Sequence, residues 1–148
     1  MKVIRPFGPT IAKVSIPEDL IHQLNNYLDQ IILSEEKIKS QDYGEKLAGN
    51  VSQEFRLEKE FVSKSGFENF IIKNAKEWIK QTVNKEINKC DIMNSWIVRQ
   101  FQNEYNPLHS HSGHISGVGY LKVPDNNGET IQKNKKENLD SIFRKITK

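Results

Sequence analysis

Three of the four histidines of this chain lie in one short segment, as His109, His111 and His114. In an extended backbone, side chains two residues apart point to the same side, so His109 and His111 can converge on one ion. Neutral imidazole is the commonest protein ligand for metal ions. His114 is out of step with that pair and follows Gly113, where we expect the chain to bend. The spacing therefore predicts a metal site built on His109 and His111, with His114 as a weaker candidate for a third ligand.

The residues after the histidines have the composition of a buried strand with free space beside it. Four apolar residues mark that strand, and three glycines leave room for a ligand to approach the backbone. The apolar residues are Ile115, Val118, Leu121 and Val123, and the glycines are Gly113, Gly117 and Gly119. The alternative is a solvated loop whose histidines bind nothing, but these flanking residues favour a metal or ligand pocket.

The segment before the histidines, residues 92–101, alternates as a strand does. Trp96, Val98 and Gln100 fall on one face, whereas Ile97, Arg99 and Phe101 fall on the other. Because this strand leads directly to the histidines, one of its faces should line the same pocket. Arg99 or Gln100 could then contact an anionic ligand, and the alternative for Arg99 is a surface salt bridge.

Three segments together resemble the first half of the iron- and 2-oxoglutarate-dependent oxygenases. They are Trp96-Ile-Val-Arg-Gln, Tyr105-Asn-Pro-Leu-His-Ser-His and Ile115-Ser-Gly-Val-Gly-Tyr-Leu-Lys-Val-Pro. The likeness is greatest to oxygenases of marine bacteria and their phages, and it covers roughly residues 7–130. The resemblance implies Fe(II) and 2-oxoglutarate as cofactor and cosubstrate. It also implies an α+β fold: an incomplete double-stranded β-helix, jelly-roll or cupin-like in form, backed by two N-terminal helices.

The same resemblance implies roles for single residues. In that family a His-x-Asp/Glu pair and a distant second His hold the iron. His109 matches the first ligand, and His111 stands where most members have a carboxylate. Tyr120 resembles a strand tyrosine that hydrogen-bonds 2-oxoglutarate, although a core aromatic with a satisfied hydroxyl is the alternative.

Two parts of the family's site have no counterpart in this sequence. The distal His and the Arg or Lys that grips the far carboxylate of 2-oxoglutarate come from later strands in the family, and no histidine follows His114. We therefore expect a truncated reading frame, one piece of a split gene, or a decayed copy.

Composition fits one folded domain and limits its partners. The 22 lysines and arginines exceed the 19 acids by three and are spread along the chain, so nucleic acid is not expected as a partner. A single cysteine, Cys90, excludes an intramolecular disulfide and fits a reducing compartment. The N-terminus lacks an apolar signal core, and no apolar run is long enough for a membrane span. We expect a cytoplasmic protein without a membrane partner, acting on a small molecule or a protein.

Apolar periodicity predicts two long helices that back a sheet. One covers about residues 16–33, with Ser15 and Glu18 as a capping box, and the other runs from Ser65 and its partner Glu68 to about residue 88. Strands are expected over 2–14 and 47–55, and a loop or short helical extension over 34–46.

The end of the chain carries a turn signal and a polar stretch. Asn127-Gly128 should begin a hairpin whose return strand is 129–132. We expect an oxygenase-like domain over 1–132, followed by a polar linker and short terminal helix over 133–148, with Asn138 as its cap.

Two alternatives to the oxygenase stay open. A cupin-like module also uses a His-x-His pair, and it would be favoured if His114 served as third ligand. A noncatalytic binding or assembly protein is the other, in which the open sheet edge of a shortened barrel pairs with another chain, for example as a homo-oligomer.

Overall fold

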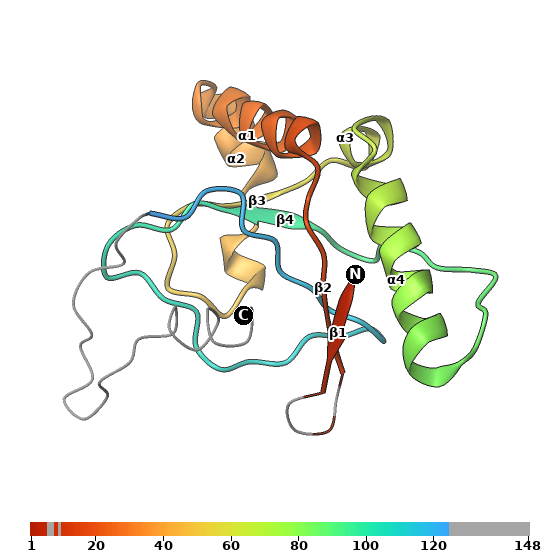
Figure 1. Cartoon of the computed structure of the whole chain (residues 1–148). Coiled ribbons are helices and arrows are strands. Elements are labelled where there is room, and N and C mark those ends of the chain that lie inside the picture. Colours follow the sequence, from red (N-terminus) through yellow and green to blue (C-terminus); the bar gives the residue numbers. More distant parts are fainter. Residues whose placement is uncertain (6–7, 9, 125–148) are drawn as a thin grey trace.

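The computed structural model describes residues 1–5, 8 and 10–124. Figure 1 shows its helices and strands, which combine helices with two small sheets, as expected of the α+β class. In chain order they are β1 (Lys2–Ile4), β2 (Ile11–Lys13), α1 (Glu18–Ile32), α2 (Glu35–Gln41), the 3-10 turn η1 (Gly44–Lys46), β3 (Glu54–Arg56), α3 (Lys59–Lys64), α4 (Phe67–Val83) and β4 (Trp96–Val98).

Both sheets are antiparallel and two-stranded: β1 pairs with β2, and β3 pairs with β4. The expected double-stranded β-helix is not formed by the residues that the structure describes. The strand expected over 2–14, with an interruption at Pro6 and Pro9, forms the β1–β2 hairpin, in which the chain reverses direction between Ile4 and Ile11.

The β3–β4 sheet is the centre of the fold. Phe55 lies opposite Ile97, and Arg56 lies opposite Trp96. Backbone hydrogen bonds extend the pairing beyond the strands: Leu57 N–H donates to the Ser95 carbonyl at 3.0 Å, and Arg99 N–H donates to the Gln53 carbonyl at 3.0 Å. The strand expected over 47–55 is therefore shorter than predicted: β3 begins only at Glu54 and ends at Arg56.

Helix α1 covers one face of this sheet with the apolar stripe that its sequence predicts. Leu20, Leu24, Leu28 and Ile31 recur every three or four residues, and all are buried against the sheet residues Phe55, Leu57 and Ile97. Burying this stripe stabilises a helix that propensity alone would leave marginal. The predicted capping box is absent, because Pro17 is the N-cap and no side chain caps the helix.

The chain after β4 passes the opposite face of the sheet. In Figure 1 this segment, drawn in cyan, runs below β3 and β4 while α1 lies above them. The sheet thus separates a helical core from a second, more polar side. That second side holds the histidine pair.

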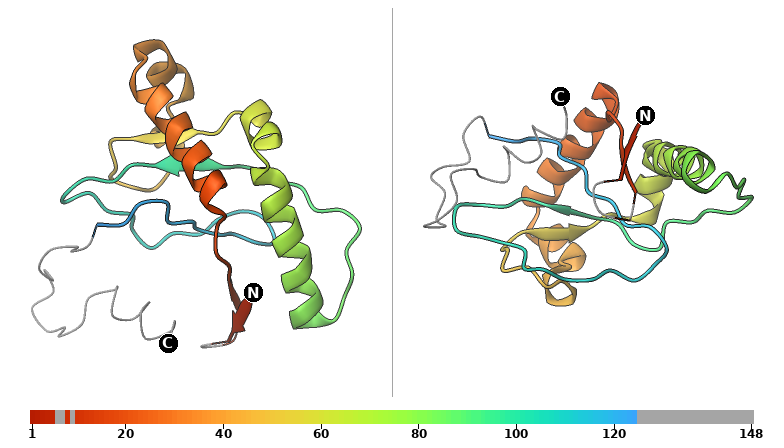
Figure 2. Two further views of the ribbon diagram at one scale, coloured as in Figure 1. Left: turned by 45° about the horizontal axis from the view of Figure 1, so that its top comes forward. Right: turned by 60° about the horizontal axis from the view of Figure 1, so that its bottom comes forward.

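Helix α4 lies beside the N-terminal hairpin, as both views in Figure 2 show. The Trp78 indole Nε1–H donates to Thr10 Oγ1 at 3.1 Å and ties the helix to the segment that leads into β2. The helix ends at Val83, before the predicted end near residue 88, because Asn84 adopts a left-handed conformation with φ 52°. At its start Ser65 Oγ accepts from Phe67 N–H, so Ser65 does not form the predicted box.

Residues 115–124 form no strand in the structure, which corrects the sequence-based expectation. Val118 is 75% exposed, and only Leu121 of the four apolar residues packs against the core. A strand needs a neighbouring strand to satisfy its backbone, and the described residues place none beside this segment. The segment 34–46 forms α2 and η1, and α3 occupies part of the charged connection expected after Arg56.

Within the ranges described, no helix is both long and apolar enough to cross a lipid bilayer. The Asn127-Gly128 hairpin and the terminal helix expected after Asn138 lie outside the described residues.

Candidate metal centre

The rings of His109 and His111 converge, as their spacing predicts. Their Nε2 atoms lie 2.9 Å apart, and the ring planes meet edge to face with centroids 4.5 Å apart. Both side chains are exposed, so an ion from solvent can reach them. The segment that carries them is not a strand, and the convergence depends on local contacts.

One of those contacts fixes the tautomer of His109. Its Nδ1–H donates to the Pro107 carbonyl at 2.7 Å, which leaves Nε2 as the nitrogen with a free lone pair. A ligating histidine needs this arrangement, in which the second nitrogen donates its hydrogen to a carbonyl or carboxylate. His109 is therefore oriented as a metal ligand would be.

The separation of the two nitrogens tests whether the pair fits a metal ion. An ion placed about 2.1 Å from each nitrogen, a usual metal–imidazole distance, would have an N–metal–N angle of about 87°. This is close to the right angle between neighbouring octahedral positions. The same 2.9 Å also suits an N–H···N hydrogen bond between the rings. The pair thus fits two adjacent positions of an octahedral ion.

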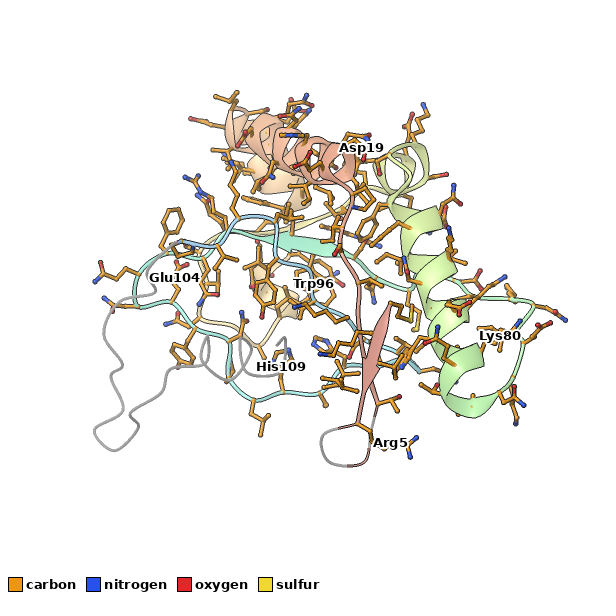
Figure 3. The ribbon with its side chains drawn as sticks, viewed as in Figure 1. Arg5, Asp19, Lys80, Trp96, Glu104 and His109 are labelled. Carbon is orange, nitrogen blue, oxygen red and sulfur yellow. The ribbon has the colours of Figure 1, made fainter. Side chains whose placement is uncertain are left out.

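Strand β4 supports the pair through Trp96. The Trp96 and His111 rings lie 5.6 Å apart at 39°, and the Tyr43 ring lies 6.1 Å from that of Trp96. Figure 3 shows Trp96 and His109 on the side of the sheet away from Asp19 of α1. Arg56, opposite Trp96 in the sheet, places its guanidinium 5.9 Å from the centre of the Tyr43 ring. Aromatic rings and a guanidinium group therefore lie beside the histidines.

A buried carboxylate, Glu54, shares this face of the sheet. Glu54 is two residues from Arg56, so alternation along β3 puts both on the side of Trp96. Glu54 is only 2% exposed, and its Oε2 has no hydrogen-bond partner. Burial raises the pKa of Glu54 above 4.5, the charges of Asp42 and Glu104 raise it further, and the electrostatic influence of His109 lowers it.

Glu104 carries the opposite perturbation. Its carboxylate accepts hydrogen bonds from Ser52 N–H at 3.0 Å and Phe101 N–H at 2.8 Å. Hydrogen bonds from Ser52 and from Phe101 hold the pKa of Glu104 below 4.5. Glu104 thus fastens the turn after β4 to the segment that precedes β3, and this turn leads to the histidines.

The structure separates His114 from the pair. Gly113 has φ 105°, a conformation that glycine adopts readily, and the chain bends there as expected. His114 instead lines a hollow of about 270 Å³ against α4, together with Trp78 and Ile115. The three histidines are therefore not brought to one point.

The two residues proposed to contact 2-oxoglutarate lie at different places. The Arg99 guanidinium stacks 4.9 Å from the centre of the Phe101 ring, and strand alternation puts Arg99 on the side of Ile97 rather than that of Trp96. Tyr120 is 61% exposed. Gln100 uses its side-chain amide to donate to the Glu104 carbonyl at 2.6 Å. The roles of Arg99 and Tyr120 stay predictions.

Among residues 1–5, 8 and 10–124, no three His, Cys, Asp or Glu side chains gather closely enough to hold a metal ion. The pair therefore accounts for two ligands. Sequence reasoning missed Glu54, because its neighbours Gln53 and Arg56 are polar and give no sign of burial, and it missed the role of Pro107.

Comparison with known proteins gives one family. The model of the family described as "Putative 2OG-Fe(II) oxygenase" matches residues 94–147, a region that begins just before β4 and includes the histidine pair. This match confirms, over that region, the resemblance seen in the sequence. No curated protein and no solved structure gives a significant match.

Proposed function

We propose that this chain is an iron- and 2-oxoglutarate-dependent oxygenase domain, a hydroxylase, in which His109 and His111 are two of the metal ligands. The 2.9 Å approach of their Nε2 atoms carries the proposal. The family match over residues 94–147 supports the choice of metal and cosubstrate. The proposal includes the finer fold expected of such a domain, a double-stranded β-helix of which β3 and β4 are part.

The residues around the pair have separate tasks. The Pro107 carbonyl keeps the hydrogen of His109 on Nδ1, and Trp96 restrains the ring of His111. Iron and 2-oxoglutarate, when bound, supply the oxidising chemistry of this class, in which the cosubstrate is decarboxylated as dioxygen is reduced. Arg99 and Tyr120 remain our candidates for contacting 2-oxoglutarate, since each brings a donor suited to a carboxylate.

Metal binding tests the proposal most directly. Titration of the protein with Fe(II) without oxygen, or with Mn(II), should show one ion per chain by calorimetry. His109→Ala and His111→Ala should each abolish this binding, because one imidazole cannot chelate. His22→Ala is the matched control, since His22 is exposed on α1 and far from the pair in sequence. Unchanged affinity in His109→Ala would refute the site.

Among the residues that the structure describes, no strand pairs with the outer edge of β4, and this favours a second candidate, assembly with another chain. Ser95 and Arg99 direct their backbone bonds to β3, so those of Trp96 and Val98, which alternate with them, point away from it. Such an edge accepts a further strand, including one from a second copy of this chain.

Size measurement tests this candidate. Light scattering after gel filtration should give a homo-oligomer, and Val98→Pro should give a monomer because proline removes an outward N–H without touching the β3 ladder. A wild-type protein that stays monomeric at high concentration would exclude assembly through this edge.

A further inference from the structure

Glu54 is costly for the fold as it stands. A carboxylate with an unpartnered oxygen, in a side chain only 2% exposed, has lost its hydration without gaining a replacement. The strand does not need this side chain, because the Glu54 carbonyl already accepts from Tyr43 N–H at 2.9 Å and the register with Val98 uses backbone groups. A residue that burdens stability in this way needs another reason for its place.

The neighbours of Glu54 add to the cost. The charges of Asp42 and Glu104 act on its carboxyl group unfavourably, and they belong to the turn before η1 and the turn after β4. A methyl group placed on Gly44 would lie 3.4 Å from Asp42 Oδ1 and 3.8 Å from Glu54 Oε2, so both oxygens border the same small space. Negative charge is therefore concentrated beneath the histidine segment.

The path from this carboxylate to the pair is short. A methyl group on Gly49 would collide with the Asn106 side chain and lie 3.2 Å from Glu54 Oε1, so Glu54 and Asn106 border the same point. Asn106 lies next to Pro107, whose carbonyl orients His109. The electrostatic influence of His109 favours the charged form of the Glu54 carboxyl group.

We propose that Glu54 supplies the negative charge required by a divalent ion held at His109 and His111, an inference that rests on the metal site proposed above. Two neutral imidazoles leave the full double charge on the ion. A carboxylate at the position of His111 would have neutralised one of the ion's two charges. Glu54, buried on the same face, provides the missing charge from a different strand, and burial strengthens its effect because little water screens it.

The proposal predicts opposite effects on binding and on stability. In Glu54→Gln the affinity for Mn(II) should fall about 10–100-fold, the usual effect of losing a supporting carboxylate outside the ligands. The metal-free protein should melt a few degrees higher, because an amide carries no buried charge and is not repelled by Asp42 and Glu104. A merely structural role for Glu54 would move stability downward instead.

Two further variants complete the experiment. Glu45→Gln makes the same change of net charge at an exposed residue of η1 and should alter Mn(II) affinity less than about twofold. Glu54→Asp keeps the charge and should retain most of the affinity. It also tests the proposal if Glu54→Gln fails to fold.

These outcomes distinguish the role of Glu54 from the metal site on which it rests. If the wild type binds Mn(II), His109→Ala does not, and Glu54→Gln binds as the wild type does, the role of Glu54 is refuted and the metal site stands. If the wild type binds no ion, both fall. If Glu54→Gln melts lower than the wild type, its weaker binding reflects damage to the fold, and the inference is overturned.

Discussion

Cobalt provides a direct test of the arrangement of the histidine pair. Co(II) commonly replaces Fe(II) or Zn(II) at nitrogen ligands, and its visible spectrum depends on the number and arrangement of ligands. Loading the protein with one equivalent of Co(II) is therefore a perturbation whose result follows from a single measured distance.

The magnitude comes from the 2.9 Å between His109 Nε2 and His111 Nε2. With bonds of about 2.1 Å, this distance corresponds to an angle of about 87° at the ion, whereas a tetrahedral ion would need the nitrogens about 3.4 Å apart. Widening the pair by that difference would pull His109 away from the Pro107 carbonyl or move His111 against Trp96. A six-coordinate ion completed by water or cosubstrate fits without such movement.

Absorption spectroscopy distinguishes the two arrangements. We expect the weak visible bands of six-coordinate Co(II), and we expect them to disappear in His111→Ala. The intense bands of a four-coordinate ion in the wild type would show that the rings do not hold an ion in the geometry seen here. Equal spectra for the wild type and His111→Ala would show that cobalt binds elsewhere.

Three further predictions concern the fold that supports the pair. Ile31→Val should destabilise the protein by about 1 kcal/mol in urea unfolding, because the Ile31 side chain of α1 is fully buried, and it should leave Mn(II) affinity unchanged. Trp78→Phe and Thr10→Val should each lower the free energy of unfolding by about 1 kcal/mol, because each removes the same hydrogen bond. The double variant should therefore lose no more than either single variant, and additive losses would contradict this. Glu104→Gln should lower the melting temperature at pH 7, and the difference from the wild type should vanish as the pH falls below 4.5. The reason is that the lowered pKa of Glu104 gives a stabilisation that is present above that value and lost when the carboxylate is protonated. A difference in melting temperature that does not depend on pH would exclude this role of the Ser52 contact.

Local sequence patterns predicted the helices because their information is local. The stripe of Leu20, Leu24 and Leu28 is enough to define α1 and its buried side, and the structure confirms both. The prediction of a capping box at the start of α1 was wrong, because Pro17 already fixes a suitable backbone at the helix start.

The strand expected over 115–123 failed because a strand is not a local object. Its apolar residues favour a strand, but pairing requires a neighbour, and the described residues place no strand beside Val118. A pattern can predict that a segment is able to form a strand. It cannot supply the second strand.

The site shows the same division. The approach of His109 to His111 follows from a two-residue spacing and is seen in the structure, whereas their role as metal ligands stays a prediction. Glu54 could not be found in this way, because the groups that act on its carboxyl group, Asp42 and Glu104, come from other segments of the chain.

The order of the strands along the chain has a consequence for how the protein reaches its native state. β3 comes before α3 and α4, and β4 comes after them, so Phe55 meets Ile97 only after a long intervening stretch has been closed into a loop. Such closure costs chain entropy and slows folding compared with local helix formation. The two imidazoles and the aromatic and cationic residues beside them thus come together only when the long-range pairing is complete. An ion with affinity for that arrangement stabilises finished molecules by mass action and leaves partly folded ones unaided.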